Sequence, residues 1–265
     1  MSADSFFFKG YSHDVCQDYS MAQDNLIIVS DGCSASPDTD FGARLLSKIA
    51  ANILNSTGVN LKTTTFTDMV VTKIKETSSF LNLHDNIFDA TLLFSTPEVQ
   101  YCYGDGVIAY VTDSEIIIYD ICYPSGAPLY LNYSTNIERK ESFINEFGVK
   151  RDVLISVLDK QTGNLKQETE VSDNNVSPYI ISGIHANVIV LMSDGINTFD
   201  QIIHNETSRF QVSLDTNVII HKLLSFKSLH GQFVKRRTKS FIKECKDLDW
   251  ENFDDVSIAA LSVGK

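Results

Sequence analysis

The chain has 265 residues, of which 43% are hydrophobic and 21% charged, and this balance excludes disordered, collagen-like and low-complexity proteins. Its 34 acidic and 22 basic residues give a net charge of -12. A field of that sign repels phosphate backbones and anionic lipids, so we expect neither nucleic acid nor a membrane surface as a partner.

The hydrophobic pattern predicts strands and helices along the whole chain. In chain order these are a strand at Leu26–Val29, helices at Phe41–Ile53 and Thr67–Leu81, strands at Ala90–Ser95, Val99–Tyr103, Val107–Val111, Glu115–Asp120, Val153–Leu158 and Val188–Met192, a helix at Gly231–Cys245 and a strand at Val256–Leu261. Several of these strands are apolar on both faces, which is typical of strands between two covering layers.

The connections between the predicted strands are short. Gly104–Gly106 and Thr112–Ser114 separate consecutive strands, and such turns predict a meander of antiparallel hairpins. Helices would then cover sheets and not link parallel strands. The stretch Asp159–Asn175 is polar, and we expect it to be a surface excursion and a candidate mobile flap.

The cysteines and the N-terminal residues bear on the compartment. The five cysteines are odd in number and form no C-x-x-C pair, so neither a disulfide framework nor a zinc knuckle is predicted. The apolar run Phe6–Phe8 is too short for a signal-peptide core, and no stretch of about 18 apolar residues occurs. We expect a soluble, cytoplasmic protein.

Aspartates stand at the ends of several predicted strands. A buried strand runs twice into the sequence Ser-Asp-Gly, and three other acidic positions adjoin apolar runs. These residues are Asp31, Asp194, Asp105 between two glycines, the pair Asp254-Asp255, and Asp18 before the first buried strand. A single Asp-Gly is a common turn pair, so each copy alone is a weak signal.

Together the aspartates predict a cation site. Carboxylates that gather without Arg or Lys repel each other unless a cation neutralises them, and oxygen ligands favour Mg²⁺ or Mn²⁺. The six histidines never occur at zinc-binding spacing. Glycine-rich nucleotide loops and the G-x-S-x-G nucleophile elbow are also absent from the sequence.

The order of these motifs resembles one known family. Gln17-Asp18, Ser30-Asp31-Gly32, Gly104-Asp105-Gly106, Ser193-Asp194-Gly195 and Asp254-Asp255-Val256-Ser257 follow each other as in the metal-dependent protein phosphatases, the type 2C serine/threonine phosphatases. The resemblance extends from about Gly10 to Val263 and is closest to the shorter bacterial and phage-type branch. It implies one domain over residues 1–265 with a four-layer α-β-β-α sandwich, in which helices flank two antiparallel sheets.

The same resemblance implies roles for individual residues. Asp31 would bridge two Mn²⁺ or Mg²⁺ ions, with the Gly32 carbonyl on one of them and Asp194 and Asp255 on the other. Asp18 would orient water or a metal ion without being one of the direct ligands, and Asp105 would hold a third ion loosely. The implied activity is hydrolysis of phosphoserine and phosphothreonine in proteins, with a phosphoprotein substrate as the partner.

Three positions depart from the family pattern. Gln17 replaces a glutamate, His13 stands where many members have a phosphate-binding arginine, and Cys33 replaces a histidine. His13 would be either a phosphate donor or structural, and Cys33 either a general acid or a packing residue. These replacements leave two alternatives open, a catalytically silent relative that binds a phosphoprotein or partner, and a domain that cations merely stabilise.

Overall fold

The computed structural model describes residues 1–57, 62–204 and 209–263. Its strands are β1 Ser2–Phe8, β2 Tyr19–Gln23, β3 Leu26–Ser30, β4 Leu92–Ser95, β5 Val99–Tyr103, β6 Gly106–Val111, β7 Glu115–Cys122, β8 Lys150–Asp159, β9 Leu165–Asn174, β10 Tyr179–Ser182, β11 Val188–Met192, β12 Phe199–His204, β13 Arg209–Ser213, β14 Trp250–Asn252 and β15 Val256–Ser262. Its α-helices are α1 Thr39–Thr57, α2 Thr63–Leu81, α3 Ile137–Phe147, α4 Thr216–Leu223 and α5 Phe233–Asp247, and its short 3-10 helices are η1 Asp85–Phe88, η2 Leu131–Thr135 and η3 Asp194–Asn197.

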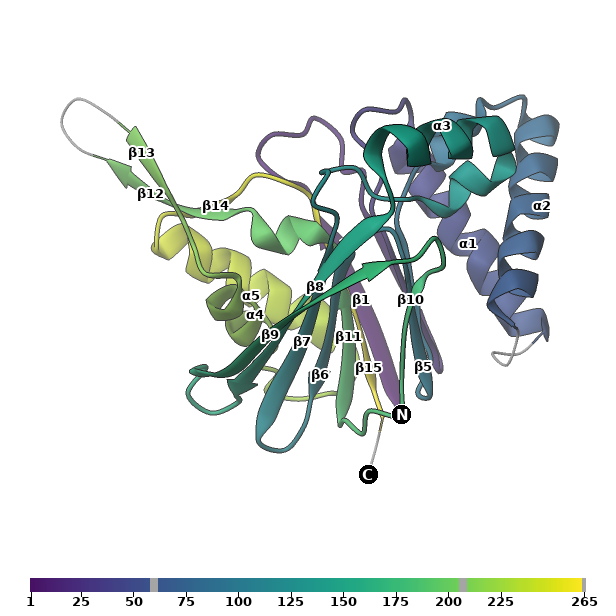
Figure 1. Cartoon of the computed structure of the whole chain (residues 1–265). Coiled ribbons are helices and arrows are strands. Elements are labelled where there is room, and N and C mark those ends of the chain that lie inside the picture. Colours follow the sequence, from purple (N-terminus) through teal and green to yellow (C-terminus); the bar gives the residue numbers. More distant parts are fainter. Residues whose placement is uncertain (58–61, 205–208, 264–265) are drawn as a thin grey trace.

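The strands form three antiparallel sheets. A seven-stranded sheet has the order β1-β15-β11-β6-β7-β8-β9, and a five-stranded sheet has the order β10-β5-β4-β3-β2. The third sheet, β13-β12-β14, is small, and its β12–β13 hairpin projects from the body (Figure 1). The predicted fold class, antiparallel sheets flanked by helices, is confirmed.

Three apolar clusters separate four layers. Side chains such as Val29, Ile108 and Leu191 are buried between the two large sheets. A second cluster joins the five-stranded sheet to α1 and α2, and a third joins the seven-stranded sheet to α4 and α5. Strands such as β3 and β11 are buried throughout because they are covered on both faces, which is why their sequences are continuously apolar.

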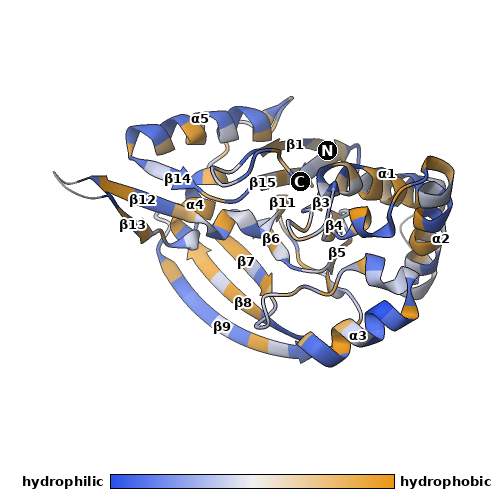
Figure 2. Ribbon diagram, turned by 90° about the horizontal axis from the view of Figure 1, so that it is seen from above, coloured by the Kyte–Doolittle hydropathy of each residue, from blue (hydrophilic) through white to orange (hydrophobic). Residues whose placement is uncertain are grey.

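One expectation about the connections is wrong, and another gains detail. The turn Gly104–Gly106 is not a hairpin, because β5 belongs to the five-stranded sheet and β6 to the seven-stranded sheet. Gly104 and Gly106 have φ values of 92° and 129°, which favour glycine, and they let the chain cross between the sheets. The polar stretch after Asp159 lies at the surface as expected, but most of it is the strand β9, nine of whose ten residues pair with β8 (Figure 2).

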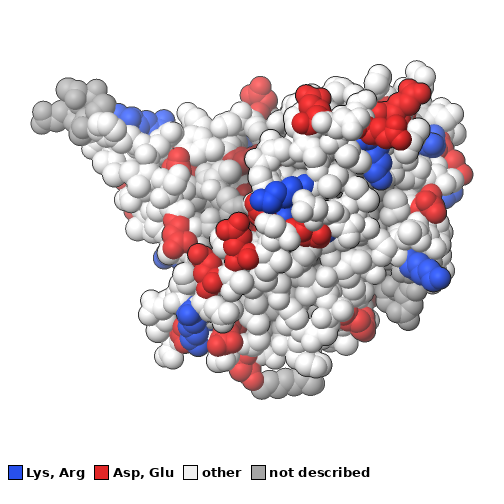
Figure 3. Space-filling model, in the orientation of Figure 1, with Lys and Arg blue, Asp and Glu red and all other residues white. Residues whose placement is uncertain are grey.

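The surface agrees with the mixed but acidic charge of the chain. Figure 3 shows acidic and basic side chains interspersed over one face, and the described residues of that face form no broad basic area. Among the residues that the structure describes, no helix is long and apolar enough to cross a membrane.

Candidate metal centre

Five aspartates meet where the two large sheets end. Asp18 precedes β2, Asp31 follows β3, Asp194 follows β11, Asp254 lies just before β15, and Asp105 lies in the crossing between β5 and β6. The registers explain this, because the strand ends carrying these residues pair directly, as at Tyr19↔Ser30 and Met192↔Ile258. We call these five residues the acidic centre.

The loop that carries Asp31 is held by the neighbouring strand. The Asp31 amide donates to Oγ1 of Thr91 at 3.0 Å, and the Thr91 amide donates to the Asp31 carbonyl at 2.8 Å. Gly32 follows, and a Cβ at this position would lie 2.8 Å from Thr39 at the start of α1. Only glycine therefore fits here without a shift of the helix.

Asp18 is held in place by the hydroxyl group of Ser193. Its side chain is fully buried, and its Oδ2 accepts a 2.6 Å hydrogen bond from the hydroxyl of Ser193. The same hydroxyl accepts from the Ser257 amide at 2.9 Å. The other oxygen of Asp18, Oδ1, is buried without a hydrogen-bond partner, and so is Oδ1 of Asp194. Each free oxygen can therefore serve as a ligand or accept a hydrogen bond from water.

Burial and the repulsion of neighbouring negative charges raise the pKa values of Asp18, Asp31 and Asp105. Burial is the main cause for Asp18, whose pKa rises to about 7, and for Asp31 and Asp105, whose pKa values lie well above the usual range. The charge of Asp194 adds to the rise at Asp31 and Asp105. Within the described part of the chain, no lysine or arginine forms an ion pair with any of these carboxylates.

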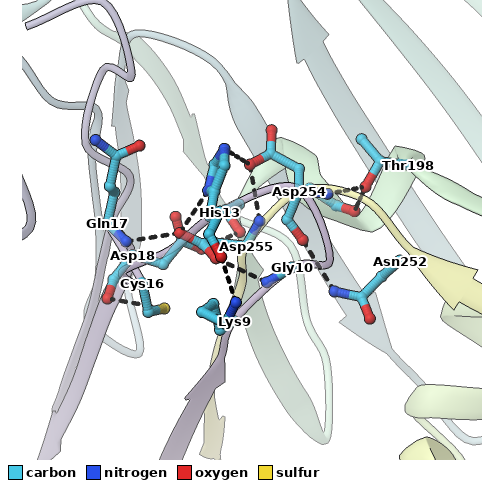
Figure 4. A network of polar contacts seen from close by, with 12 residues as sticks. Lys9, Gly10, His13, Cys16, Gln17, Asp18, Thr198, Asn252, Asp254 and Asp255 are labelled. Atoms are coloured by element: carbon cyan, nitrogen blue, oxygen red, sulfur yellow. Dashed lines mark hydrogen bonds and ion pairs between the residues drawn. The ribbon is translucent and has the colours of Figure 1, made fainter.

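Asp254 and Asp255 lie side by side but face different surroundings (Figure 4). Asp255 is 1% exposed, and both its oxygens are occupied by main-chain amides: Oδ1 by Gly10 at 2.7 Å and Oδ2 by Gln17 at 2.6 Å. Asp254 is 38% exposed, and burial followed by the charge of Asp194 raises its pKa. Asp254 is thus close enough to Asp194 for their two negative charges to repel each other.

His13 contacts both members of this pair. Its Nδ1 lies 2.9 Å from Oδ2 of Asp255, and its Nε2 lies 3.5 Å from Oδ1 of Asp254. Burial lowers the pKa of His13, but the contact with Asp255 and the nearby negative charges outweigh it, so the net shift is upward. These three residues place potential ligand atoms within 4.8 Å of one another.

The other two departures from the family pattern are also placed. The Gln17 side-chain amide donates to Oγ1 of Thr39 at 2.9 Å, so it holds the start of α1. The Cys33 side chain packs against an aromatic cluster that includes Tyr130 and Tyr133.

Asp120 was missed in the sequence. It lies in β7 opposite Val107, and its carboxylate accepts hydrogen bonds from Nδ2 of Asn197 at 3.3 and 3.4 Å. Burial, together with the charge of Asp194, raises its pKa to about 6 despite the Asn197 contact. The detectable signal was an acidic residue inside a strand that is otherwise mostly apolar.

Comparisons with known proteins bear on the fold and the family. The PPM serine/threonine phosphatase MsPP of Mycobacterium smegmatis, solved with cacodylate, has a TM-score of 0.56 at 11% identity, with 100% of this chain and 99% of that chain covered. A bacterial serine phosphatase, solved as a point mutant, also has a TM-score of 0.56, at 12% identity with the same coverage. At these identities the likeness shows a shared fold. No curated protein matches the chain in sequence.

The family is shown by a sequence comparison. The model of a family described as protein phosphatase 2C matches residues 10–218, which is most of the chain and contains Asp18, Asp31, Asp105 and Asp194. The chain belongs to the protein phosphatase 2C family.

Proposed function

We propose that this protein hydrolyses phosphoserine and phosphothreonine in proteins with the help of Mn²⁺ or Mg²⁺. The observation that supports this most is the acidic centre, whose carboxylates have no lysine or arginine partner among the described residues. Two of them, Asp18 and Asp194, each keep a buried oxygen without a partner. Such a group of all-oxygen donors fits a hard divalent cation and does not fit zinc.

The magnitude of the reaction barrier also favours a metal mechanism. Phosphomonoester hydrolysis needs up to about 10²¹-fold acceleration, and one general acid or base supplies roughly 10²- to 10⁴-fold. A pair of bound divalent cations would lower the pKa of a water and neutralise the phosphoryl oxygens. Residues of the chain must hold that pair.

We assign the ligands from the positions of the side chains. Asp31, the Gly32 carbonyl, Asp194 and Asp254 would hold the two cations, and Asp105 would hold a third one loosely beside Asp194. Asp254 takes the place that the sequence motif suggested for Asp255, because the Asp255 oxygens are already bonded to the Gly10 and Gln17 amides. Asp255 would then fix the N-terminal loop and orient His13.

Two residues would act on water and substrate. Asp18, oriented by Ser193, would accept a hydrogen bond from water at its free Oδ1. His13, held by Asp255 and carrying a raised pKa, would donate to the substrate phosphate from the rim of the centre. With the cations bound, the carboxylates would be ionised and would act only as acceptors, since an ionised Asp has no proton to donate.

Turnover tests the proposal directly. We expect hydrolysis of para-nitrophenyl phosphate and of a phosphothreonine peptide with Mn²⁺, and none after chelation. Asp194→Asn should lose this activity while its circular dichroism spectrum stays unchanged. If Mn²⁺ binds but neither substrate is hydrolysed, the protein is a silent relative that binds phosphoproteins or partners, and the proposal fails.

The ligand assignment has its own test. Asp254→Asn should weaken Mn²⁺ binding by about 10-fold or more, because it removes one charged ligand from a site with few of them. Asp255→Asn should weaken Mn²⁺ less and lower the melting temperature more, since it disturbs two main-chain hydrogen bonds. Calorimetric titration with Mn²⁺ and thermal melts in EDTA measure both, and the reverse ranking would return the ligand role to Asp255.

A further inference from the structure

Another buried carboxylate, that of Asp89, lies outside all the sequence motifs and beside the loop that carries Asp31 and Gly32. Asp89 is 1% exposed and forms hydrogen bonds with three side chains. Its Oδ1 accepts from Asn132 at 2.8 Å and from Arg139 at 3.0 Å, and its Oδ2 accepts from Ser36 at 2.8 Å and from Arg139 at 2.5 Å. We call Ser36, Asp89, Asn132 and Arg139 the Asp89 junction.

One side of the junction is the loop that carries Asp31 and Gly32. The main-chain carbonyl of Asp89 accepts a 2.8 Å hydrogen bond from the Cys33 amide, and Ala90 forms a β-bridge with Gly32. Ser36 belongs to the same loop and bonds to the Asp89 side chain. The loop is therefore attached to Asp89 both directly after Gly32 and near its far end.

The other side of the junction is the connection between β7 and β8. Asn132 lies in η2 and Arg139 in α3, and the Arg139 guanidinium lies 4.5 Å from the ring centroid of Tyr133. Tyr133 stacks on Phe143 and belongs to an aromatic cluster against which Cys33 packs. We call residues 123–149 the connecting segment.

The Arg139 guanidinium donates one hydrogen bond to each oxygen of Asp89, and we call this two-bond pair a fork. A fork has a narrow range of allowed geometries, and its hydrogen bonds are stronger when little water reaches them. Movement of the loop or of the connecting segment would break this fork and leave the Asp89 charge buried without its partner. The two parts consequently have to keep a fixed relative position. Asp89 is 50 residues from Arg139 in sequence, so only the folded chain provides this link.

We propose that Asp89 is a positioning residue that couples the loop of Asp31 and Gly32 to the connecting segment, so that cation binding and the packing of this segment stabilise each other. This inference rests on the proposed metal ligands. Coupling of this kind is reciprocal: whatever the connecting segment contributes to cation affinity, the cation contributes to the order of the segment.

The test compares two arginine forks in the full-length protein. Arg139→Gln removes the fork of the junction. Arg237→Gln is the matched control, because Arg237 forms a similar fork with Glu244 within α5, at 2.6 and 3.3 Å. Both variants and the wild type are titrated with MnCl₂ by calorimetry, and hydrogen exchange of residues 130–147 is measured with and without Mn²⁺.

We expect Mn²⁺ to slow exchange in the connecting segment of the wild type and of Arg237→Gln. In Arg139→Gln this slowing should disappear, and the Mn²⁺ affinity should fall by about 5- to 10-fold, the lower range of measured couplings. Wild-type affinity and wild-type slowing in Arg139→Gln would overturn the proposal. If this variant does not fold, Arg139→Lys keeps the charge without the fork and should show a smaller loss of the same two quantities.

The readouts separate this inference from the proposed activity. A wild type that binds Mn²⁺ but hydrolyses no phosphoester would refute the proposed function and leave the coupling supported by exchange and affinity. An active enzyme in which Arg139→Gln binds Mn²⁺ normally would refute the coupling alone.

Discussion

Asp18 and Asp89 are both buried aspartates, with 0% and 1% exposure, but their surroundings are opposite. Asp89 has an arginine fork and two further donors around it. Asp18 has one serine hydroxyl, a free oxygen, and other aspartates as neighbours. The chain thus supplies a positive partner to one carboxylate and leaves the other without one.

The difference separates a structural carboxylate from a candidate binding one. A buried charge is stable only when it is paired, and an unpaired one shifts its pKa to become neutral. The Asp89 junction is complete within the chain. In the proposed function, a cation from outside the chain would complete the acidic centre. The following predictions test this contrast, beginning with the largest effect.

Asp31→Asn should reduce Mn²⁺-dependent turnover by at least about 10³-fold, because several kcal/mol of charge stabilisation at the reacting phosphate is lost. In EDTA the same variant should melt at a higher temperature than the wild type, since one buried, repelled carboxyl group has been removed. Hydrolysis of para-nitrophenyl phosphate and melts in EDTA measure these effects. Turnover near that of the wild type would show that Asp31 is not a ligand needed for the reaction.

Asp89→Asn should have the opposite effect on stability. Breaking a buried ion pair costs about 3–5 kcal/mol, and we expect about 2–4 kcal/mol because the Arg139 side chain is 30% exposed and partly screened. Urea denaturation in EDTA gives the free energy of unfolding. Glu76→Gln, which breaks the exposed pair with Lys73, is the control and should change it by less than about 0.5 kcal/mol. A stability gain in Asp89→Asn would erase the contrast.

The pH dependence of the metal-free protein follows from the pKa of Asp18. In the folded state this pKa is about 7, against an ordinary value of 3.8, so the folded state holds more protons between these two pH values. Stability should therefore fall as pH rises from about 4 to about 7, with Asp31 and Asp105 acting in the same direction. Saturating Mn²⁺ should abolish the fall, because the cation binds the ionised carboxylates. Melts across this range, with Mn²⁺ and with EDTA, measure it, and equal slopes in the two series would contradict a cation site.

The smallest effect is expected for His13, at the rim of the acidic centre. If it binds the substrate phosphate, His13→Ala should raise KM by several-fold and lower kcat less, since such a contact already exists in the ground state. His185→Ala, at an exposed position, should change neither constant. An unchanged KM in His13→Ala would leave it as a structural partner of Asp255.

The buried strands and the aspartates at their ends were the features that the sequence predicted best. Runs such as Leu26–Val29 and Val188–Met192 are continuously apolar because both faces are covered, so the strands and the aspartates that follow them could be found. The helix α3 was missed because only Phe143 is buried in it. Strand β9 was missed because nine of its ten residues are exposed, and no apolar alternation marks it.

Other features depend on contacts that no local pattern records. The link between Asp89 and Arg139 joins positions 50 residues apart, and neither residue belongs to a motif. The choice between Asp254 and Asp255 depends on which side chain the Gly10 and Gln17 amides reach, and this is set by how the N-terminal loop folds back. Two adjacent carboxylates look alike in a sequence.

The polar character of β9 has a consequence for how the molecule behaves at high concentration. As the outermost strand of a seven-stranded sheet it presents a row of unpaired amides and carbonyls, which is a template for pairing with another chain. Its side chains include Lys166, Glu168 and Glu170, so an approaching strand would bring charges together and lose their hydration. The charged side chains of β9 therefore make it unfavourable for another chain to pair with its free edge. In this way they protect the pair β8–β9, which has the longest register of the fold, from aggregation.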